Sequence, residues 1–289
     1  MMRAWIHKSP NLPLEKGMEL MEKHPRPSES LKAKEILVHV KCVGVNPADP
    51  LFAEMTWPAR AIIKQTPLPG MDFSGEVVSV GSGVTSMRPG DRVFGRGCVL
   101  MPPGIDFEQA AGVGTAAITA YETIVLNCKA GDWVFINGGT GGVGTFAIQF
   151  AKAHGWHVAD VVSMLNERGR VFRLVVDYAY REETNLYRAS NNFIKQGGKF
   201  IMVPGDLSGR IIQTICRNML CPSVLGGGQA KFEVYFAKSN RAAFEHIAEW
   251  MAAGKVRTVI DTIYGFGDMP EAIQKIKSGT ATGKIVVRV

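Results

Sequence analysis

Three glycines, Gly139, Gly141 and Gly144, stand at the spacing G-x-G-x-x-G, which can bind the pyrophosphate of a dinucleotide. In such a turn the first glycine permits a tight bend, the second lets the backbone approach a phosphate, and the third lets a helix pack closely on a strand. The phosphates bind the free N–H groups at the start of the helix. The alternative is a purely structural turn, because the chain has 32 glycines.

The residues around these glycines predict a strand before the turn and a helix after it. The run from Trp133 to Ile136 is apolar and rich in β-formers, and another apolar strand is predicted at 156–159. Between them, apolar residues recur at helical spacing: Val143, Ala147, Phe150 and Ala151. A nucleoside-triphosphate loop would need Lys and then Ser or Thr after its last glycine, where this chain has Thr145 and Phe146. The context therefore favours a dinucleotide-binding turn.

Length and composition indicate a globular chain. The 289 residues are 46% hydrophobic and 20% charged, which is enough to bury a full core in two domains. No apolar stretch reaches the roughly 18 residues of a membrane helix. The first ten residues lack the features of a secretory signal or a transit peptide, so we expect a cytoplasmic protein without a membrane partner.

Charge and cysteine spacing exclude two further classes. The net charge of +7 comes from 33 basic and 26 acidic residues, spread along the chain without the basic block expected of a nucleic-acid partner. The five cysteines form no C-x-x-C pair and have no His at ligand spacing. We therefore expect no metal and no disulfide.

The first domain is expected over 1–110 as a small β-barrel. The polar entry up to Ser30 indicates a loop, and Glu35 to Val45 alternates as a half-buried strand that ends in a turn, Asn46 to Pro50. Short strands broken by Gly and Pro fill Pro67 to Gly95. The last residues, about 258–289, are expected to return to this domain.

The second domain is expected over 111–257 as a parallel sheet with alternating helices. Its predicted helices are 108–126, 160–168, 182–194 and 240–253, and its further strands are 171–177, 199–203 and 232–236. Asp268 and Glu271 suggest a capping box for a helix that ends near Gly279, before a strand at 284–289.

The order of motifs resembles a known family over nearly the whole chain. The motifs are VNPAD, PLPGMDFSGEVVSVGSGV, RPGDRVFG, GTAAITAYET, NGGTGGVGTFAIQFAK, GGKFIMVPG, AGKVRTVI and MPEAIQKIKSGTATGKIVV. They resemble the zinc-independent medium-chain dehydrogenase/reductases, in the quinone oxidoreductase and enoyl reductase group. The resemblance implies an α/β fold class: a GroES-like β-barrel catalytic domain plus a shortened Rossmann doubly wound parallel sheet. It also implies NADPH as cofactor, a small-molecule substrate and a homodimer.

The same resemblance implies cofactor-binding residues but no dedicated acid or base, so the catalytic residues are unknown. The implied cofactor-binding residues are Asn46, Asp49, Thr119, Gly139, Thr140, Gly141, Gly142, Val143, Gly144, Gly205 and Lys284. For Asn46 the alternative is an ordinary turn residue, and for Lys284 a solvated surface lysine. Where zinc enzymes of the family have Gly-His-Glu, this chain has Gly70-Met71-Asp72. Loss of the metal favours reduction of a conjugated C=C bond or a quinone, where hydrogen-bond donors can stabilise the charge.

Two internal segments of the family pattern are missing. After Gly97 the barrel lacks a hairpin, and after Ala159 the Rossmann sheet lacks the loop that reads the 2′-phosphate, a helix and a strand. Asp160 stands near the distance of an NAD ribose ligand, but we interpret it as the cap of the following helix. Two functions remain open: an NADPH-dependent reductase of enones, quinones or enoyl thioesters, or a truncated, non-catalytic family member.

Overall fold

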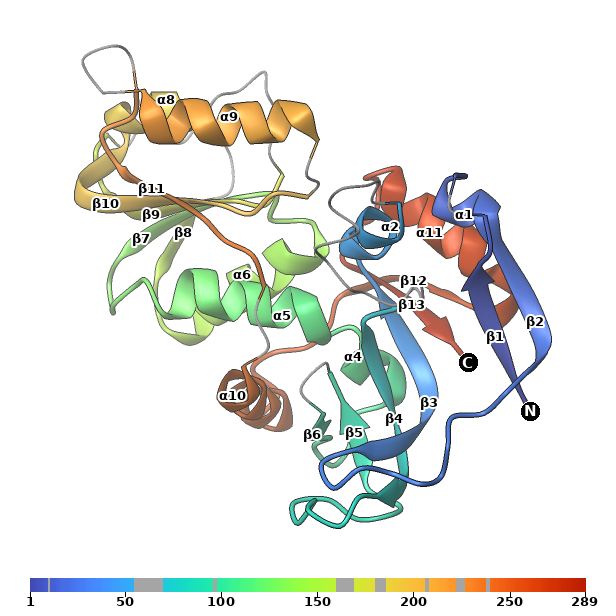
Figure 1. Cartoon of the computed structure of the whole chain (residues 1–289). Coiled ribbons are helices and arrows are strands. Elements are labelled where there is room, and N and C mark those ends of the chain that lie inside the picture. Colours follow the sequence, from blue (N-terminus) through green and yellow to red (C-terminus); the bar gives the residue numbers. More distant parts are fainter. Residues whose placement is uncertain are drawn as a thin grey trace. The chain divides into compact units, whose positions relative to one another are not determined.

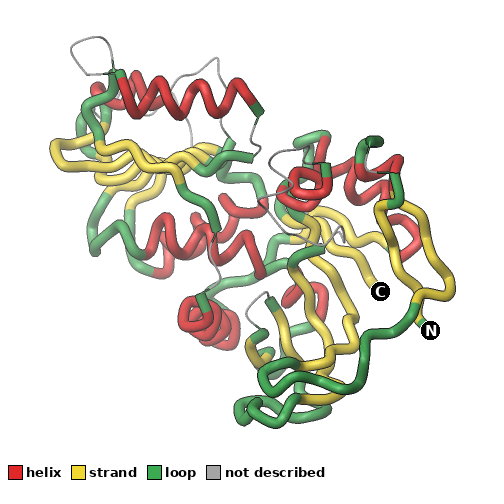
Figure 2. The backbone as a smooth tube through the Cα atoms, viewed as in Figure 1, coloured by secondary structure: helices red, strands yellow, loops and turns green. Residues whose placement is uncertain are grey.

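The computed structural model describes residues 1–9, 11–54, 70–95, 98–159, 169–179, 186–205, 208–221, 227–237 and 240–289. The chain divides into two compact units, Met1–Thr115 with Ser239–Val289, and Ala116–Lys238. The first unit is rich in antiparallel strands, whereas the second has a parallel sheet between helices (Figures 1 and 2). This is the predicted α/β fold class.

The first unit is built on a six-stranded sheet of order β12-β13-β3-β4-β5-β6. Its strands are β3 (Ile36–Val45), β4 (Asp72–Val80), β5 (Arg92–Phe94), β6 (Val99–Leu100), β12 (Ile260–Tyr264) and β13 (Lys284–Arg288). The last strand, β13, pairs antiparallel with β3, so that Ile285 lies opposite Val45. The chain end therefore returns to the first unit, as predicted. Short helices flank the sheet: α2 (Ala48–Ala53), α4 (Phe107–Ala111) and α11 (Met269–Lys277), which follows the 3₁₀ turn η5 (Phe266–Asp268).

The predicted N-terminal loop is wrong, because this segment forms a β-hairpin. Strands β1 (Met2–His7) and β2 (Met18–His24) pair antiparallel around the short helix α1 (Leu14–Gly17). Trp5 packs on the cluster that contains Leu14, and its indole nitrogen donates to the Phe266 carbonyl over 2.7 Å. Tertiary packing stabilises these strands, whose local sequence pattern is weak.

The predicted loss of a barrel hairpin corresponds to a short connection between β5 and β6. Phe94 lies opposite Val99, so only residues 95–98 join the two strands. At the two ends of this connection the backbone is left-handed, with φ of 75° at Gly95 and 45° at Cys98. The remaining strands therefore pair directly where the family pattern has additional chain.

The amphipathic helix near residue 250 lies in the first unit. Helix α10 (Arg241–Ala252) starts at Asn240, whose side chain accepts from Ala243 N–H, and buries Phe244. The Phe244 ring meets Phe94 edge to face, with centroids 6.4 Å apart. The second unit, Ala116–Lys238, is thus shorter than the predicted second domain, 111–257, since residues 239–257 belong to the first unit.

The second unit contains a five-stranded parallel sheet of order β11-β10-β9-β7-β8. Its strands are β7 (Trp133–Asn137), β8 (His157–Ala159), β9 (Phe172–Asp177), β10 (Ile194–Met202) and β11 (Lys231–Val234). Helices α8 (Leu186–Ala189) and α9 (Gly209–Leu220) lie on one face, and α6 (Gly142–Ala153) lies on the other (Figure 1). Among the described strands, β8 is the last of this sheet on its side. The interpreted Asp160 cap and helix 160–168 lie outside the described residues.

Three predicted helices need correction. The range 108–126 is divided into α4, α5 (Gly114–Ala120) and a π-helical turn, η1 (Tyr121–Val125). Of the predicted helix 182–194, residues 182–185 lie outside the described residues; the rest forms α8 and the 3₁₀ turn η3 (Ser190–Asn192), and β10 already begins at Ile194. Helix α11 forms without the predicted capping box, because Asp268 accepts from Gly265 N–H instead.

Among the described residues, none of the helices combines the length and the apolar character needed to cross a membrane.

The contact between Phe94 and Phe244 predicts a stability test. Phe94 is fully buried, so Phe94→Ala should lower the free energy of unfolding by about 3–5 kcal/mol. Leu100→Ala in the paired strand is the control, because Leu100 is 46% exposed and should cost far less. Urea denaturation measures both; equal effects would contradict the packing of α10 on the barrel.

Candidate functional site

The glycine turn joins β7 to the start of α6, as predicted. Gly141 is the N-cap residue and provides no side-chain cap, and the N–H of Thr145 bonds to the Gly141 carbonyl over 3.0 Å. The N–H groups of Gly142, Val143 and Gly144 precede the first intrahelical donor, so they are available to an anion. Thr140 lies within the same turn.

The glycines of this turn have different steric roles. Gly138, with φ of 86°, supplies the left-handed bend that the sequence analysis assigned to Gly139. A Cβ at Gly144 would lie 2.1 Å from the Gly138 carbonyl oxygen, so helix and strand can pack this closely only without a side chain. At Gly141 the nearest atom would be 3.5 Å away. The fold therefore has room for a side chain at Gly141, but that side chain would occupy the position of a bound phosphate.

Polar side chains gather at the carboxyl ends of the parallel strands. Asn137 and Asp177 lie opposite each other in β7 and β9, and the Asn137 amide donates to the Asp177 carboxylate over 2.7 Å. Burial raises the pKa of Asp177, and this hydrogen bond opposes the rise. Gly205 follows the end of the neighbouring strand β10 and is exposed. The structure thus places Gly205 at the same sheet edge as the glycine turn.

Thr119 lies next to the π-helical turn of the second unit. It is 3% exposed, and its backbone carbonyl accepts from the Thr123 hydroxyl over 2.7 Å. The same Thr123 hydroxyl lies 2.6 Å from that of Tyr178, the first residue after β9. The hydroxyl groups of Thr123 and Tyr178 therefore link the Thr119 backbone to the carboxyl end of β9 by hydrogen bonds.

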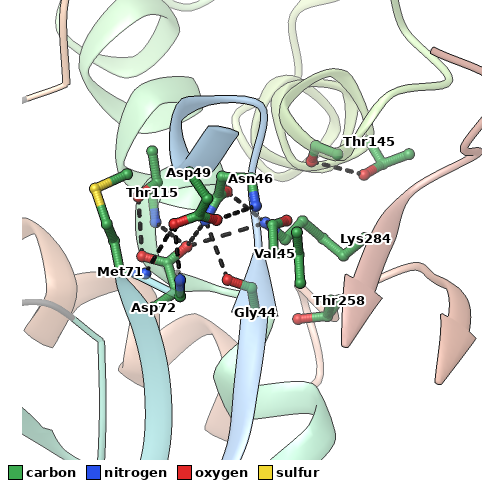
Figure 3. A network of polar contacts seen from close by, with 12 residues as sticks. Gly44, Val45, Asn46, Asp49, Met71, Asp72, Thr115, Thr145, Thr258 and Lys284 are labelled. Carbon is green, nitrogen blue, oxygen red and sulfur yellow. Dashed lines mark hydrogen bonds and ion pairs between the residues drawn. The ribbon is translucent and has the colours of Figure 1, made fainter. Parts of the chain in front are cut away.

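The other predicted residues, Asn46, Asp49 and Lys284, meet in the first unit (Figure 3). Because Ile285 pairs with Val45, Lys284 comes to the end of β3 beside Asn46. The Lys284 Nζ donates to Asn46 Oδ1 over 2.6 Å and to the Val45 carbonyl over 3.0 Å. Lys284 is only 3% exposed, so the alternative of a solvated surface lysine is wrong.

Asp49 holds the turn after β3 through backbone donors. Its carboxylate accepts from the N–H groups of Asn46 at 2.7 Å, Gly70 at 2.9 Å and Met71 at 3.1 Å. Burial raises the pKa of Asp49 to about 6, although these three bonds oppose the rise. The nearby carboxylate of Asp72 adds to it. The Asn46 turn is thus a fixed structure with a buried acid at its centre.

Asp72 completes this network, and the sequence analysis did not include it among the site residues. Its carboxylate accepts from Asn46 Nδ2 at 2.8 Å, Thr115 N at 2.7 Å and Thr115 Oγ1 at 2.9 Å (Figure 3). It is fully buried, and Lys284 Nζ lies 4.0 Å away. The sequence does contain a signal for Asp72, since its carboxylate lies inside the apolar stretch MDFSGEVV. A charge that is buried with such a stretch needs a hydrogen-bond or charge partner.

The residues at this place are poor zinc ligands. The Asp72 carboxylate is already occupied by three donors, and Met71 stands where the family's zinc enzymes have His. Cys42 is buried, and burial raises its pKa to about 11, which disfavours the thiolate that binds metal. Among the described residues, no three His, Cys, Asp or Glu side chains group as a metal site.

Comparison with known proteins identifies the family. Residues 32–158 match the family described as alcohol dehydrogenase GroES-like domain, and residues 156–287 match the one described as zinc-binding dehydrogenase. The trans-enoyl reductase pgmF of Aspergillus terreus is 33% identical over 349 residues, covering all of this chain and 96% of its own. The human quinone oxidoreductase is 25% identical over 300 residues, 89% of each protein.

The fold agrees with solved structures of such enzymes. The quinone oxidoreductase of Escherichia coli, solved as a complex with NADPH, superimposes with a TM-score of 0.76 at 20% identity, over 99% of both chains. The chain belongs to the medium-chain dehydrogenase/reductase family. Within it, the chain falls in the branch of quinone oxidoreductases and enoyl reductases, and it is an oxidoreductase with a GroES-like domain and a Rossmann-type sheet.

The close approach at Gly144 predicts a specific loss of stability. Gly144→Ala should lower the free energy of unfolding by about 1–3 kcal/mol, because the added methyl group meets rigid backbone. Gly141→Ala is the matched control in the same turn and should change it little. Thermal and urea denaturation compare the two variants. A Gly144→Ala protein more stable than wild type would mean that helix propensity outweighs the contact.

The buried Asp49 predicts a pH dependence of stability. Since its pKa in the fold, about 6, exceeds the ordinary 3.8, the folded state binds more protons between these values than the unfolded state. The free energy of unfolding of wild type should therefore fall, relative to Asp49→Asn, by about 2 kcal/mol as pH rises from 4 to 7. Urea denaturation at several pH values measures this difference. A difference that grows with pH would show that the backbone donors outweigh burial.

Proposed function

We propose that this chain uses NADPH to reduce an activated C=C bond or a quinone, by hydride transfer without zinc. The observation that carries the proposal is the uncapped start of α6, where three N–H groups lie beside Gly141, whose Cβ position has one neighbour, the Gly138 carbonyl oxygen at an ordinary contact distance of 3.5 Å. This cradle fits a pyrophosphate, since both the donors and the room are present. The bound nicotinamide would supply the hydride.

The proposal gives each predicted cofactor residue a role. The turn from Gly139 to Gly144 would bind the pyrophosphate, with Thr119 and Gly205 beside the carboxyl ends of the strands. Asn46, Asp49 and Lys284 would hold the nicotinamide ribose through the rigid turn after β3. These contacts bind and orient, and no side chain among them is assigned a proton transfer.

The substrate class follows from the donor chemistry and the relatives. Without a metal, a developing negative charge is best tolerated when it spreads into an enolate or a hydroquinone, as in reduction of an enone, an enoyl thioester or a quinone. The names of the relatives, trans-enoyl reductase and quinone oxidoreductase, support this class. The proposal also includes a small-molecule substrate, a role in secondary metabolism, a cytoplasmic location and a homodimer.

The alternative is a non-catalytic family member, and one observation supports it. The match to the Aspergillus terreus enzyme spans 349 residues against 289 here, so about 60 positions of that enzyme have no counterpart. Among the described strands, β8 is at the edge of the sheet, where the family pattern continues into the segment that reads the 2′-phosphate. Cofactor binding therefore distinguishes the two functions.

Titration with NADPH and, separately, NADH tests the proposal directly. Tryptophan fluorescence should show saturable binding of NADPH by wild type and none by Gly141→Val, because the side chain fills the phosphate position while the fold accepts it. Gly209→Val is the control, since Gly209 starts α9 in the same unit and has open space at its Cβ position. Circular dichroism establishes that each variant is folded.

Binding lost only in Gly141→Val would justify assays with an enone, an enoyl thioester and a quinone, followed by NADPH absorbance. A folded wild type that binds neither nucleotide would overturn the reductase proposal in favour of the non-catalytic alternative.

A further inference from the structure

The side-chain amide of Asn46 is held by partners that leave it one orientation. Its Nδ2 donates to Asp72 Oδ2 over 2.8 Å and to the Gly44 carbonyl over 3.2 Å, and its Oδ1 accepts from Lys284 Nζ over 2.6 Å. A carboxylate only accepts hydrogen bonds and an ammonium group only donates them. Rotating the amide by half a turn would therefore set donor against donor at Lys284 and acceptor against acceptor at Asp72.

Asp72 also connects the Asn46 side chain with β4 and with residues 114–115 of the first unit. It is the first residue of β4 and lies opposite Gly44 of β3. Its two oxygens also accept both hydrogen-bond donors of Thr115. A Cβ at Gly114 would lie 2.0 Å from the Asp72 carboxyl carbon, so the chain at 114–115 can approach only because residue 114 is glycine.

Charge adds to these hydrogen bonds. Asp72 is 0% exposed and Lys284 3% exposed, and the two charged groups are 4.0 Å apart. Burial lowers the pKa of Lys284, whereas the carboxylates of Asp72 and Asp49 oppose that change. The buried carboxylates therefore help to keep Lys284 as the charged donor that Asn46 needs.

We propose that Asp72 is a positioning residue, which orients the Asn46 amide and keeps Lys284 beside it, so that the turn after β3 is ready for the cofactor without a metal. The proposal rests on the proposed function, because Asn46 and Lys284 are assigned there to the nicotinamide ribose. It has a chemical consequence. Both N–H groups of the Asn46 amide are used internally, so a ligand can contact this side chain only by donating to Oδ1, as a hydroxyl group does.

The nearby Ser74 allows a matched control in the same strand. Ser74 is also 0% exposed, and its hydroxyl donates to the Phe107 carbonyl over 2.6 Å, away from the Asn46 amide. Ser74→Ala removes a partly buried hydrogen bond of β4 and leaves the Asp72 contacts in place. If Asp72 only stabilises the fold, Asp72→Ala and Ser74→Ala differ in stability alone.

The experiment compares wild type, Asp72→Ala, Asp72→Asn and Ser74→Ala. The first readout is made without cofactor: ¹⁵N NMR follows the hydrogen exchange of the Asn46 side-chain amide, together with the urea midpoint of each protein. The second is the Kd for NADPH from the fluorescence titration, with all proteins held well below their unfolding transitions.

Wild type and Ser74→Ala should show a protected Asn46 amide and similar Kd values. Asp72→Ala should lose the protection and bind NADPH at least about tenfold more weakly, the equivalent of one charge-assisted hydrogen bond. Asp72→Asn should recover part of the affinity, because the oxygen of its amide can still accept from Asn46 Nδ2 and Thr115 N.

Two results would overturn the positioning role. One is equal Kd values for Asp72→Ala and Ser74→Ala, and the other is an Asp72→Asn protein no better than Asp72→Ala. Failure of the proposed function is different, since then wild type itself would not bind NADPH although its Asn46 amide is protected.

Discussion

The first unit depends on a buried carboxylate and a buried ammonium group that stabilise each other. Either charge alone would be strongly unfavourable in the interior, and removing one partner of such a pair costs about 3–5 kcal/mol. Asp72 begins β4, whereas Lys284 begins the last strand of the chain. The pair therefore requires the chain end to return to the sheet, and it requires β3 to lie between the two strands that carry the charges. The rigid turn after β3 is a consequence of this closure.

The second unit depends on a different constraint, the space around the glycine turn. Gly138 provides the backbone conformation, Gly144 the close packing of helix on strand, and Gly141 the open approach to the N–H groups of α6. Within this short segment, different glycines are thus needed for folding and for ligand binding. This separation explains why a single turn can be tested for binding without unfolding the protein.

The strongest local patterns were predicted correctly from the sequence. The G-x-G-x-x-G turn between β7 and α6, the amphipathic helix α10 and the alternating strand β3 each follow from their own residues. The hairpin β1–β2 was missed because contacts far away in sequence, such as Trp5 with Phe266, stabilise it. The burial of Lys284 was not predictable locally, because its partners Asn46 and Asp72 lie at the other end of the chain. Asp72 was visible as a buried carboxylate, but only the structure identifies what it binds.

The short connection between β5 and β6 has a cost in backbone conformation. Cys98 has a left-handed backbone, a conformation that costs an ordinary residue about 1–2 kcal/mol relative to glycine. A turn long selected for this geometry would have Gly or Asn at that place. The pairing of Phe94 with Val99 therefore holds Cys98 in a backbone conformation that a residue with a side chain does not favour.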